Sequence, residues 1–206
     1  MSNFLQAQVK IEGTRPLWQH KFGPDALPLE KQERSGVAGN DPTEWRRSCS
    51  VNTAGQLYLD PSYVFGCLRN GAKYTKSGRA SIQTKVVATL QVTSDVLLID
   101  RWYPGFPDQA KEFDAATVEP CSDDRTQPVY LDIRGVVNPA TKGRNVRYRL
   151  AASPGWQTDF TIMWDKTLVS RGEMEAVVRD AGQYIGLGNG RTIGIGRFEM
   201  LAFSVG

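Results

Sequence analysis

Five glycines lie within the eleven residues from Gly186 to Gly196, in the string Ile-Gly-Leu-Gly-Asn-Gly-Arg-Thr-Ile-Gly-Ile-Gly that begins at Ile185. Glycine at this density marks backbone that must turn tightly or come close to another group. The position of the string is its most constraining property, because a predicted helix precedes it and a predicted strand follows it. Dinucleotide and phosphate loops need the reverse order, strand then helix, and the chain has no Gly-Lys-Ser/Thr, so a nucleotide-hydrolysing P-loop is not expected.

The helix before the glycines has a clear start. Ser170 and Glu173 form a capping-box pattern, and Val169 and Met174 stand at the positions of a hydrophobic staple. Apolar residues then recur at three- and four-residue steps and predict one buried stripe: Met174, Val177, Val178, Ala181, Tyr184 and Ile185. After the glycines, the alternation from Phe198 to Ala202 predicts a partly buried strand.

Alternating patterns elsewhere predict further strands at 5–11, 129–137, 146–150 and 156–164, and a short apolar run predicts one at 95–100. The segments 45–51 and 56–59 are expected to form a hairpin. Asp60-Pro61 opens a second helix, whereas 82–92 is compatible with helix or strand. This order predicts an α+β protein, with a ferredoxin-like (RRM-like) antiparallel sheet and helices on one face. We expect a single domain over 1–206, with long inserted loops or small lobes at about 19–44 and 102–128.

Composition excludes several classes of protein. With 206 residues, 40% hydrophobic and 23% charged, the chain is expected to be globular. Its three cysteines have no metal-type spacing, which predicts reduced thiols in a cytoplasmic protein, and one histidine leaves little basis for a zinc site. We expect no metal, no cofactor, no secretory signal and no membrane span.

Basic residues are unevenly distributed although the net charge is only +3. Two stretches lack acidic residues: one holds Arg69, Lys73, Lys76, Arg79 and Lys85, and the other holds Lys142, Arg144, Arg147 and Arg149. Such runs are either solvated faces or sites for anions. On the predicted strand 146–150, alternation places Arg147 and Arg149 on the face opposite Val146, Tyr148 and Leu150, toward solvent or a ligand.

The glycine string resembles the C-terminal glycine-rich loop of the RAMP superfamily, the RNA-recognition-like proteins of CRISPR systems. In both, an apolar-Gly-apolar-Gly pair precedes a Gly-apolar-Gly pair, between a helix and a strand. The segment from Tyr58 to Arg69 is similar to the family's first helix, with Ser62 directly after Pro61. The chain also resembles small phage-encoded proteins with Arg-Pro-Leu-x-x-His after the first strand and Tyr-x-Gly-Leu-Gly near the end, here Arg15 to His20 and Tyr184 to Gly188.

The RAMP resemblance implies binding of single-stranded RNA, with glycine backbone and basic side chains against the phosphates. The candidate binding residues are Arg15, Lys21, Arg69, Lys73, Lys76, Arg79, Arg144, Arg147, Arg149, Gly186, Gly188, Gly190, Arg191, Gly194 and Gly196. Trp18, Trp45, Trp102 and Tyr103 are candidate stacking platforms for bases. The alternative for the glycines is a tight helix-to-strand connection packed on the sheet.

Three functions follow as hypotheses. The first is a non-catalytic module that coats single-stranded RNA or DNA through repeated subunits, as a homo-oligomer or within a multi-subunit complex, like the backbone subunits of CRISPR effector complexes. The second is a metal-independent endoribonuclease that uses His20 as general acid or base, with Arg15 and Lys21 near it. The third is a phage protein that acts through a protein–protein interface.

Overall fold

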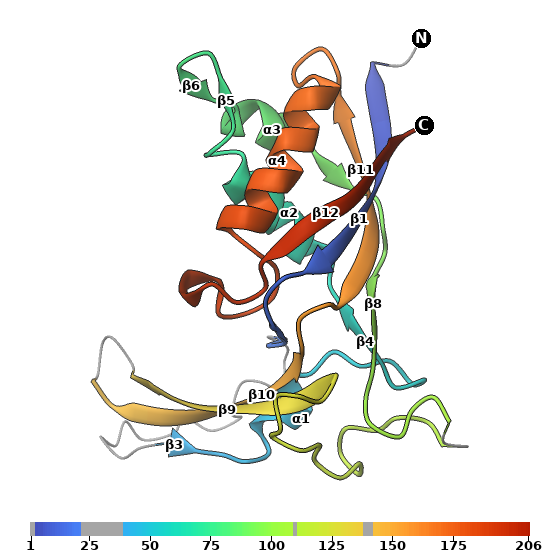
Figure 1. Cartoon of the computed structure of the whole chain (residues 1–206), viewed down its shortest axis with the longest axis vertical. Helices are drawn as coiled ribbons and strands as arrows, with labels where there is room; N and C mark the ends of the chain where they lie inside the picture. Colours follow the sequence, from blue (N-terminus) through green and yellow to red (C-terminus); the bar gives the residue numbers. More distant parts are fainter. Residues whose placement is uncertain (1–2, 22–38, 109–110, 138–141) are drawn as a thin grey trace. The chain divides into compact units, whose positions relative to one another are not determined.

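The computed structural model describes residues 3–21, 39–108, 111–137 and 142–206, and the chain forms two compact units (Figure 1). Unit 1 consists of Met1–Leu17, Tyr58–Asp100 and Pro154–Gly206, and unit 2 of Trp18–Leu57 and Arg101–Ser153. The described parts of both predicted inserted regions lie in unit 2, whereas 22–38 and 109–110 lie outside the described residues. The single domain over the whole chain stays a prediction.

Unit 1 is built on a four-stranded antiparallel sheet in the order β12-β1-β11-β7. The strands are β1 (Phe4–Gly13), β7 (Gln91–Val92), β11 (Gln157–Asp165) and β12 (Phe198–Val205). Along β1, Ala7, Val9 and Ile11 are fully buried while the residues between them face outward, so only one face of the sheet is covered. The antiparallel sheets and the helices confirm the α+β class predicted from the sequence.

Three helices cover the buried face, as Figure 1 shows: α2 (Ser62–Gly71), α3 (Gln83–Thr89) and α4 (Arg171–Tyr184). The predicted capping box of α4 is confirmed, because the Ser170 side chain accepts the Glu173 N–H and the Glu173 carboxylate accepts the Ser170 N–H at 2.8 Å. Asp60 accepts the Ser62 N–H at 2.8 Å at the start of α2. Helices α2 and α4 approach closely: a Cβ on Gly71 would lie 2.6 Å from the Cβ of Ala181.

The segment after β7 runs along the outer side of β11 and is tied to it through side chains. The Thr161 N–H donates to the Ser94 hydroxyl at 2.8 Å, and the Thr158 hydroxyl donates to the Leu98 carbonyl at 2.8 Å. The first bond satisfies a backbone N–H of β11, and the second satisfies a backbone carbonyl of the segment after β7. Unit 1 also holds the short hairpin β5 (Lys76–Ser77) and β6 (Ala80–Ser81), and the 3₁₀ turn η2 (Arg191–Ile193).

Unit 2 contains β9 (Val129–Val137), β10 (Arg144–Ala152), β3 (Gly39–Asn40) and α1 (Glu44–Ser48). Strand β10 pairs antiparallel with β9 and parallel with β3. The elements β2 (Leu17–Trp18), β4 (Gln56–Leu59) and β8 (Leu97–Trp102) span the divisions between the units. In unit 2 the ring of Tyr103 stacks on Trp45 and packs against Phe113, at centroid distances of 5.8 and 5.0 Å.

The predicted strand at 45–51 is wrong over its first half, which forms α1, whereas Val51 pairs antiparallel with Leu57 as the predicted hairpin requires. The Asp41 carboxylate accepts the Thr43 N–H at 3.0 Å, Pro42 follows it, and Glu44 stands in the first helical turn. Aspartate followed by proline is the same helix-start signal that identifies α2 from its sequence, and Glu44 in the first turn favours the helix further. None of the helices in the described residues has the length and hydrophobicity needed to cross a membrane.

Candidate nucleic-acid interface

The glycine loop, residues 186–196, joins α4 to the strand β12, as the sequence predicts. All five of its glycines adopt left-handed backbone, with φ between +70° and +85°. Other residues adopt this conformation only with strain. The glycines are therefore required by the backbone path of the loop.

Two of the glycines let the ends of the loop come together. The Leu187 N–H donates to the Gly196 carbonyl at 2.9 Å, and the Gly196 N–H donates to the Pro16 carbonyl at 2.8 Å. A Cβ on Gly196 would lie 1.8 Å from the Leu187 carbonyl oxygen, and one on Gly186 would lie 2.7 Å from the Gly196 backbone. These contacts support the alternative of a tight connection at Gly186 and Gly196.

The tip of the loop is different. Gly190 and Gly194 flank the η2 turn, and a Cβ on Gly194 would meet open space. Thr192 and Ile193 are exposed, and Arg191 is half-buried. Backbone that can approach a ligand therefore lies at the tip, between Gly190 and Gly194.

A cavity of about 380 Å³ lies beside the loop in unit 1. Its wall is formed by the C-terminal ends of two helices and by the loop: Asn70, Lys73 and Tyr74 follow or end α2, Tyr184 and Ile185 end α4, and Arg191, Thr192 and Arg197 come from the loop and its exit. Residues more than 100 positions apart in the sequence are thus brought together.

The cavity is basic. Lys73, Arg191 and Arg197 line it together with uncharged residues only, and within the described part of the chain none of the three makes an ion pair. The Nη1 atom of Arg197 is buried without a hydrogen-bond partner among the described residues. A buried guanidinium nitrogen without a partner is costly.

Two tyrosines stand at the rim of this cavity. Tyr74 and Tyr184 are 52% and 44% exposed, and their ring centroids lie 4.9 Å apart with 38° between the planes. The sequence pattern places Tyr184 in the buried stripe of α4, and that is wrong. Tyr74 carries no signal beyond its place after an apolar helix, so only the tertiary structure shows the pair.

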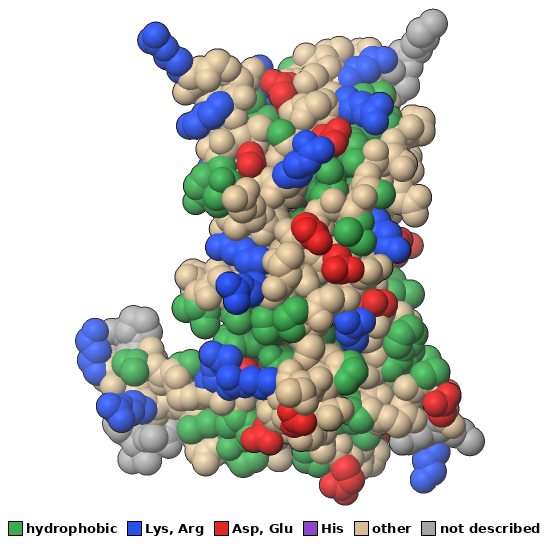
Figure 2. Space-filling view, viewed as in Figure 1, with side chains coloured by type: hydrophobic (Ala, Val, Ile, Leu, Met, Phe, Trp, Pro, Cys, Tyr) green, Lys and Arg blue, Asp and Glu red, His purple; other side chains and the backbone are tan. Residues whose placement is uncertain are grey.

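The other predicted basic residues of unit 1 lie in different places. Arg15 is exposed, and its backbone N–H donates to the Arg197 carbonyl at 3.2 Å. Arg15 therefore lies next to the loop. Arg69 is exposed in the last turn of α2. Basic side chains of unit 1 stand in small groups separated by acidic and uncharged surface on the face that Figure 2 shows.

The basic stretch 69–85 is divided between the two ends of α4. Lys73 lies near the C-terminal end of α4. Ser77 and Lys85 lie near Glu173, in the first turn of α4. The pKa of Glu173 is lowered mainly by its hydrogen bonds to Ser170, and to a smaller extent by Ser77 and Lys85. Fourteen helical residues span about 20 Å. Lys76 and Arg79, in the β5–β6 hairpin that contains Ser77, are therefore remote from the loop cavity.

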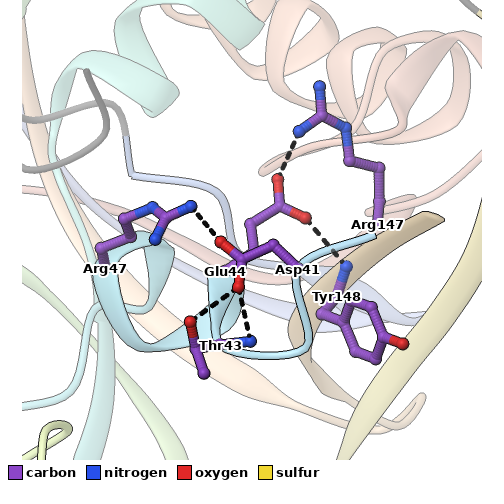
Figure 3. A network of polar contacts seen from close by, with 6 residues as sticks. All are labelled: Asp41, Thr43, Glu44, Arg47, Arg147 and Tyr148. Carbon is purple, nitrogen blue, oxygen red and sulfur yellow. Dashed lines mark hydrogen bonds and ion pairs between the residues drawn. The ribbon is translucent and has the colours of Figure 1, made fainter. Parts of the chain in front are cut away.

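In unit 2, Arg147 is engaged within the protein. Its Nη1 atom lies 2.6 Å from Oε1 of Glu44, and the Tyr148 N–H donates to the other oxygen of Glu44 at 3.0 Å (Figure 3). In the same network Asp41 binds Thr43 and Arg47, and the Thr43 hydroxyl is the main cause that lowers the pKa of Asp41. Arg147 thus joins β10 to α1.

Arg149 and Arg134 lie on the same face as Arg147. Their guanidinium carbons stand 5.3 and 4.6 Å from the centroid of the Trp18 ring, within cation–π range. Arg134 also pairs with the fully buried Asp132 at 2.8 Å. Arg144 is exposed, and the register places it on the opposite face, with Val146 and Tyr148.

His20 is half-buried in unit 2, and Lys21 after it is exposed. Burial and then the positive charges of Arg149 and Arg147 lower the pKa of His20 below 6.5, while Glu44 opposes them. The imidazole is therefore neutral at pH 7 and has the form that accepts a proton.

Three of the four expected stacking platforms are not accessible. Trp18, Trp45 and Tyr103 are buried, and Trp102 alone among the four is exposed. Trp156 and Trp164 are fully buried, as their parity predicts. In the part of the chain that the structure describes, no three His, Cys, Asp or Glu side chains are grouped so as to hold a metal ion.

No protein-family model matches the chain, and no curated protein matches it. Among solved structures, it is similar to a chain of the "Cryo-EM structure of the Type III-B Cmr-beta bound to cognate target RNA". The identity is 14%, the TM-score is 0.46, and the match covers 98% of this chain and 60% of that one. The protein thus spans about three fifths of the length of that neighbour.

Proposed function

We propose that the protein binds single-stranded nucleic acid, RNA in particular, without cleaving it, and that phosphates of the strand lie at the loop cavity. The observation that carries this proposal is the set of Lys73, Arg191 and Arg197, which converge on one cavity without a carboxylate partner among the described residues. Charge-assisted hydrogen bonds from such groups, with glycine backbone beside them, suit a phosphate.

We infer further that unit 1 has the ferredoxin-like (RRM-like) plan. The order β1, α2 and α3, β7, β11, α4, β12 and the pairing order β12-β1-β11-β7 support this inference. The resemblance of the glycine loop to that of the RAMP superfamily supports the same plan and the choice of RNA.

The open face of the sheet is a poor site for the strand. It carries Glu12, Asp159, Asp165 and Glu199 but only one cation, Lys10, among its described residues. RNA-recognition sheets stack bases on aromatic residues of this face, and here the described strands offer Phe4 alone. The charge distribution therefore favours the loop cavity at the helix ends.

The test is the titration of a labelled 30-mer of single-stranded RNA, and of the matching DNA, with pure protein at two salt concentrations. Binding should weaken as salt rises, and a denaturing gel should show the strand intact. Arg191→Ala and Lys73→Ala should each weaken binding about tenfold, the value of one charge-assisted bond. Arg171→Ala, an exposed arginine in the first turn of α4, is the matched control and should bind as the unchanged protein does.

No binding at low salt would refute the nucleic-acid proposal and leave a protein–protein interface, such as that of a phage protein, as the function to test. If the strand is coated by repeated subunits, the number of protomers bound should rise in proportion to its length. Native mass spectrometry with 15-, 30- and 45-mers measures this number.

The second candidate function is a metal-independent endoribonuclease based on His20. Its supporting observation is the neutral imidazole beside Arg149 and Arg147, since a neutral histidine can take the proton of a ribose 2′-OH and an arginine can stabilise the phosphate. Cleavage of the RNA but not the DNA strand in the presence of EDTA, abolished in His20→Ala, is the result this candidate requires.

A further inference from the structure

We propose that Tyr74 and Tyr184 form a platform on which one base of the strand stacks, while its phosphate is held by the cations of the loop cavity. This inference rests on the proposed function and deepens it. A charged cavity alone would bind any phosphate chain, whereas a platform of this kind selects strands whose bases are unpaired.

The two rings are not needed to hold their helices together. Helices α2 and α4 already meet beneath them, where Gly71 contacts Ala181 and the Cys67 thiol lies 3.7 Å from the Ala181 carbonyl. About half of each tyrosine nonetheless remains exposed, 52% of Tyr74 and 44% of Tyr184. An aromatic pair that is both outside the helix contact and open to solvent is available to a ligand.

The backbone that carries both rings is hydrogen-bonded. Tyr184 is the last residue of α4, and the Tyr74 N–H donates to the Gly71 carbonyl at 2.8 Å in the turn that follows α2. A platform that is fixed before binding loses little entropy when a base is added. Rings on helix ends meet this condition better than rings on a free loop.

The chemistry of the surroundings identifies a nucleotide. Lys73 precedes Tyr74 directly, and Arg191 and Arg197 line the same cavity as both tyrosines. Exposed aromatic rings next to three cations match a base joined to a phosphate. An acidic peptide would use the cations but would leave the rings without a partner.

The experiment compares a single-stranded RNA 12-mer with an abasic 12-mer that has the same phosphates, in anisotropy titrations with the unchanged protein. This comparison requires no variant to fold. We expect the abasic strand to bind about tenfold more weakly, with the same dependence on salt, because stacking is lost and the phosphate contacts remain.

Tyr184→Ala and Tyr74→Ala should weaken binding of the normal 12-mer by about the same factor and leave binding of the abasic strand unchanged. Tyr184→Phe, which keeps the ring, should bind as the unchanged protein does. Leu168→Ala is the control for loss of exposed apolar surface, because Leu168 is 45% exposed and lies before α4, away from the loop.

Equal affinity for the normal and abasic strands, with Arg191→Ala still weakening both, would overturn the platform and leave the proposed function intact. Failure of the unchanged protein to bind either strand would overturn the proposed function and the platform with it. A glutamate-rich peptide that binds more tightly than RNA would likewise overturn the platform and favour a protein partner.

Discussion

The Nη1 atom of Arg147 lies 2.6 Å from the carboxylate of Glu44, a side chain that is only 8% exposed. Among the described residues, Arg147→Ala would leave that carboxylate with the Tyr148 N–H as its remaining bond, so we expect the free energy of unfolding to fall by about 1–3 kcal/mol. Urea denaturation measures this change. Arg144→Ala, at an exposed arginine on the other face of β10, should stay within about 0.5 kcal/mol of the unchanged protein.

A double-mutant cycle with Glu44→Gln separates the ion pair from other effects of the two substitutions. Equal stability of the Arg147→Ala and Arg144→Ala variants would show that the pair contributes nothing. The stability of Arg147→Ala also decides how its RNA affinity is interpreted. A loss of affinity in this variant indicates a phosphate contact only if the variant is as stable as the wild-type protein.

The glycines of the loop should differ in how well they tolerate alanine. In Gly194→Ala the added Cβ meets open space, so the only cost is that alanine must adopt a left-handed backbone conformation. That conformation costs roughly 1–2 kcal/mol. Gly196→Ala adds a clash with the Leu187 carbonyl oxygen and should lower the free energy of unfolding by more than about 3 kcal/mol. Thermal unfolding followed by circular dichroism ranks the two variants.

Gly66→Ala is the matched control for these substitutions. Gly66 lies inside α2 with ordinary helical backbone and nothing within 4 Å of an added Cβ, so alanine should stabilise by about 0.5–1 kcal/mol. If Gly196→Ala were as stable as Gly194→Ala, the close approach of the two ends of the loop would be wrong.

Local signals explain which elements of the fold were predictable. The capping box at Ser170 and the Asp60-Pro61 signal each involve residues within four positions of one another, so they can be recognised in the sequence. Both helices begin where these signals place them. The first half of the strand predicted at 45–51 forms a helix although its residues alternate, and the helix-start signals at Asp41 and Glu44 stand just before it and in its first turn. Alternation over a few residues is therefore a weaker signal than an aspartate, a proline and an early glutamate in succession.

The candidate site was only partly predictable for a different reason. The glycine loop is visible in sequence because its backbone demands glycine at each of five positions. The cavity is not visible, since Lys73 and Tyr74 reach the loop through the packing of α2 on α4. Tyr184 and Trp18 show the same limit: hydrophobic periodicity does not tell whether an aromatic ring at the end of an element is buried or exposed.

The three cysteines should react slowly in the folded protein. Burial raises the pKa of the Cys67 thiol to about 12, and that of Cys49 and Cys121 to about 11. At pH 8 the thiolate fraction of each is then about 0.1% or less. Titration with Ellman's reagent should show little reaction in buffer and three thiols in urea, with Cys67 last to react as urea rises.

Fewer than three thiols in urea, after purification without reductant, would contradict the prediction of reduced cysteines. The slowest reaction should disappear in Cys67→Ala, which assigns it to the Cys67 thiol. It should persist in the control variant Cys121→Ala. Rapid modification of the folded protein would show that the burial of these thiols is wrong.

The pKa of His20 is the most direct test of the unit 2 cluster, because the chain has one histidine and its imidazole signals in proton NMR are therefore unambiguous in a tag-free protein. Burial first, and then Arg149, should hold the titration midpoint below 6.5. Since the folded protein then binds fewer protons than the unfolded chain, this contribution to stability is complete above pH 6.5 and is lost as the pH falls through the lower, folded value.

Arg149→Gln should move the midpoint up toward 6.5, whereas Arg144→Gln, at an exposed residue of the same strand, should not. A midpoint at or above 6.5 in the unchanged protein would show that His20 is solvated and unaffected by the arginines, and would remove the observation that favours the nuclease.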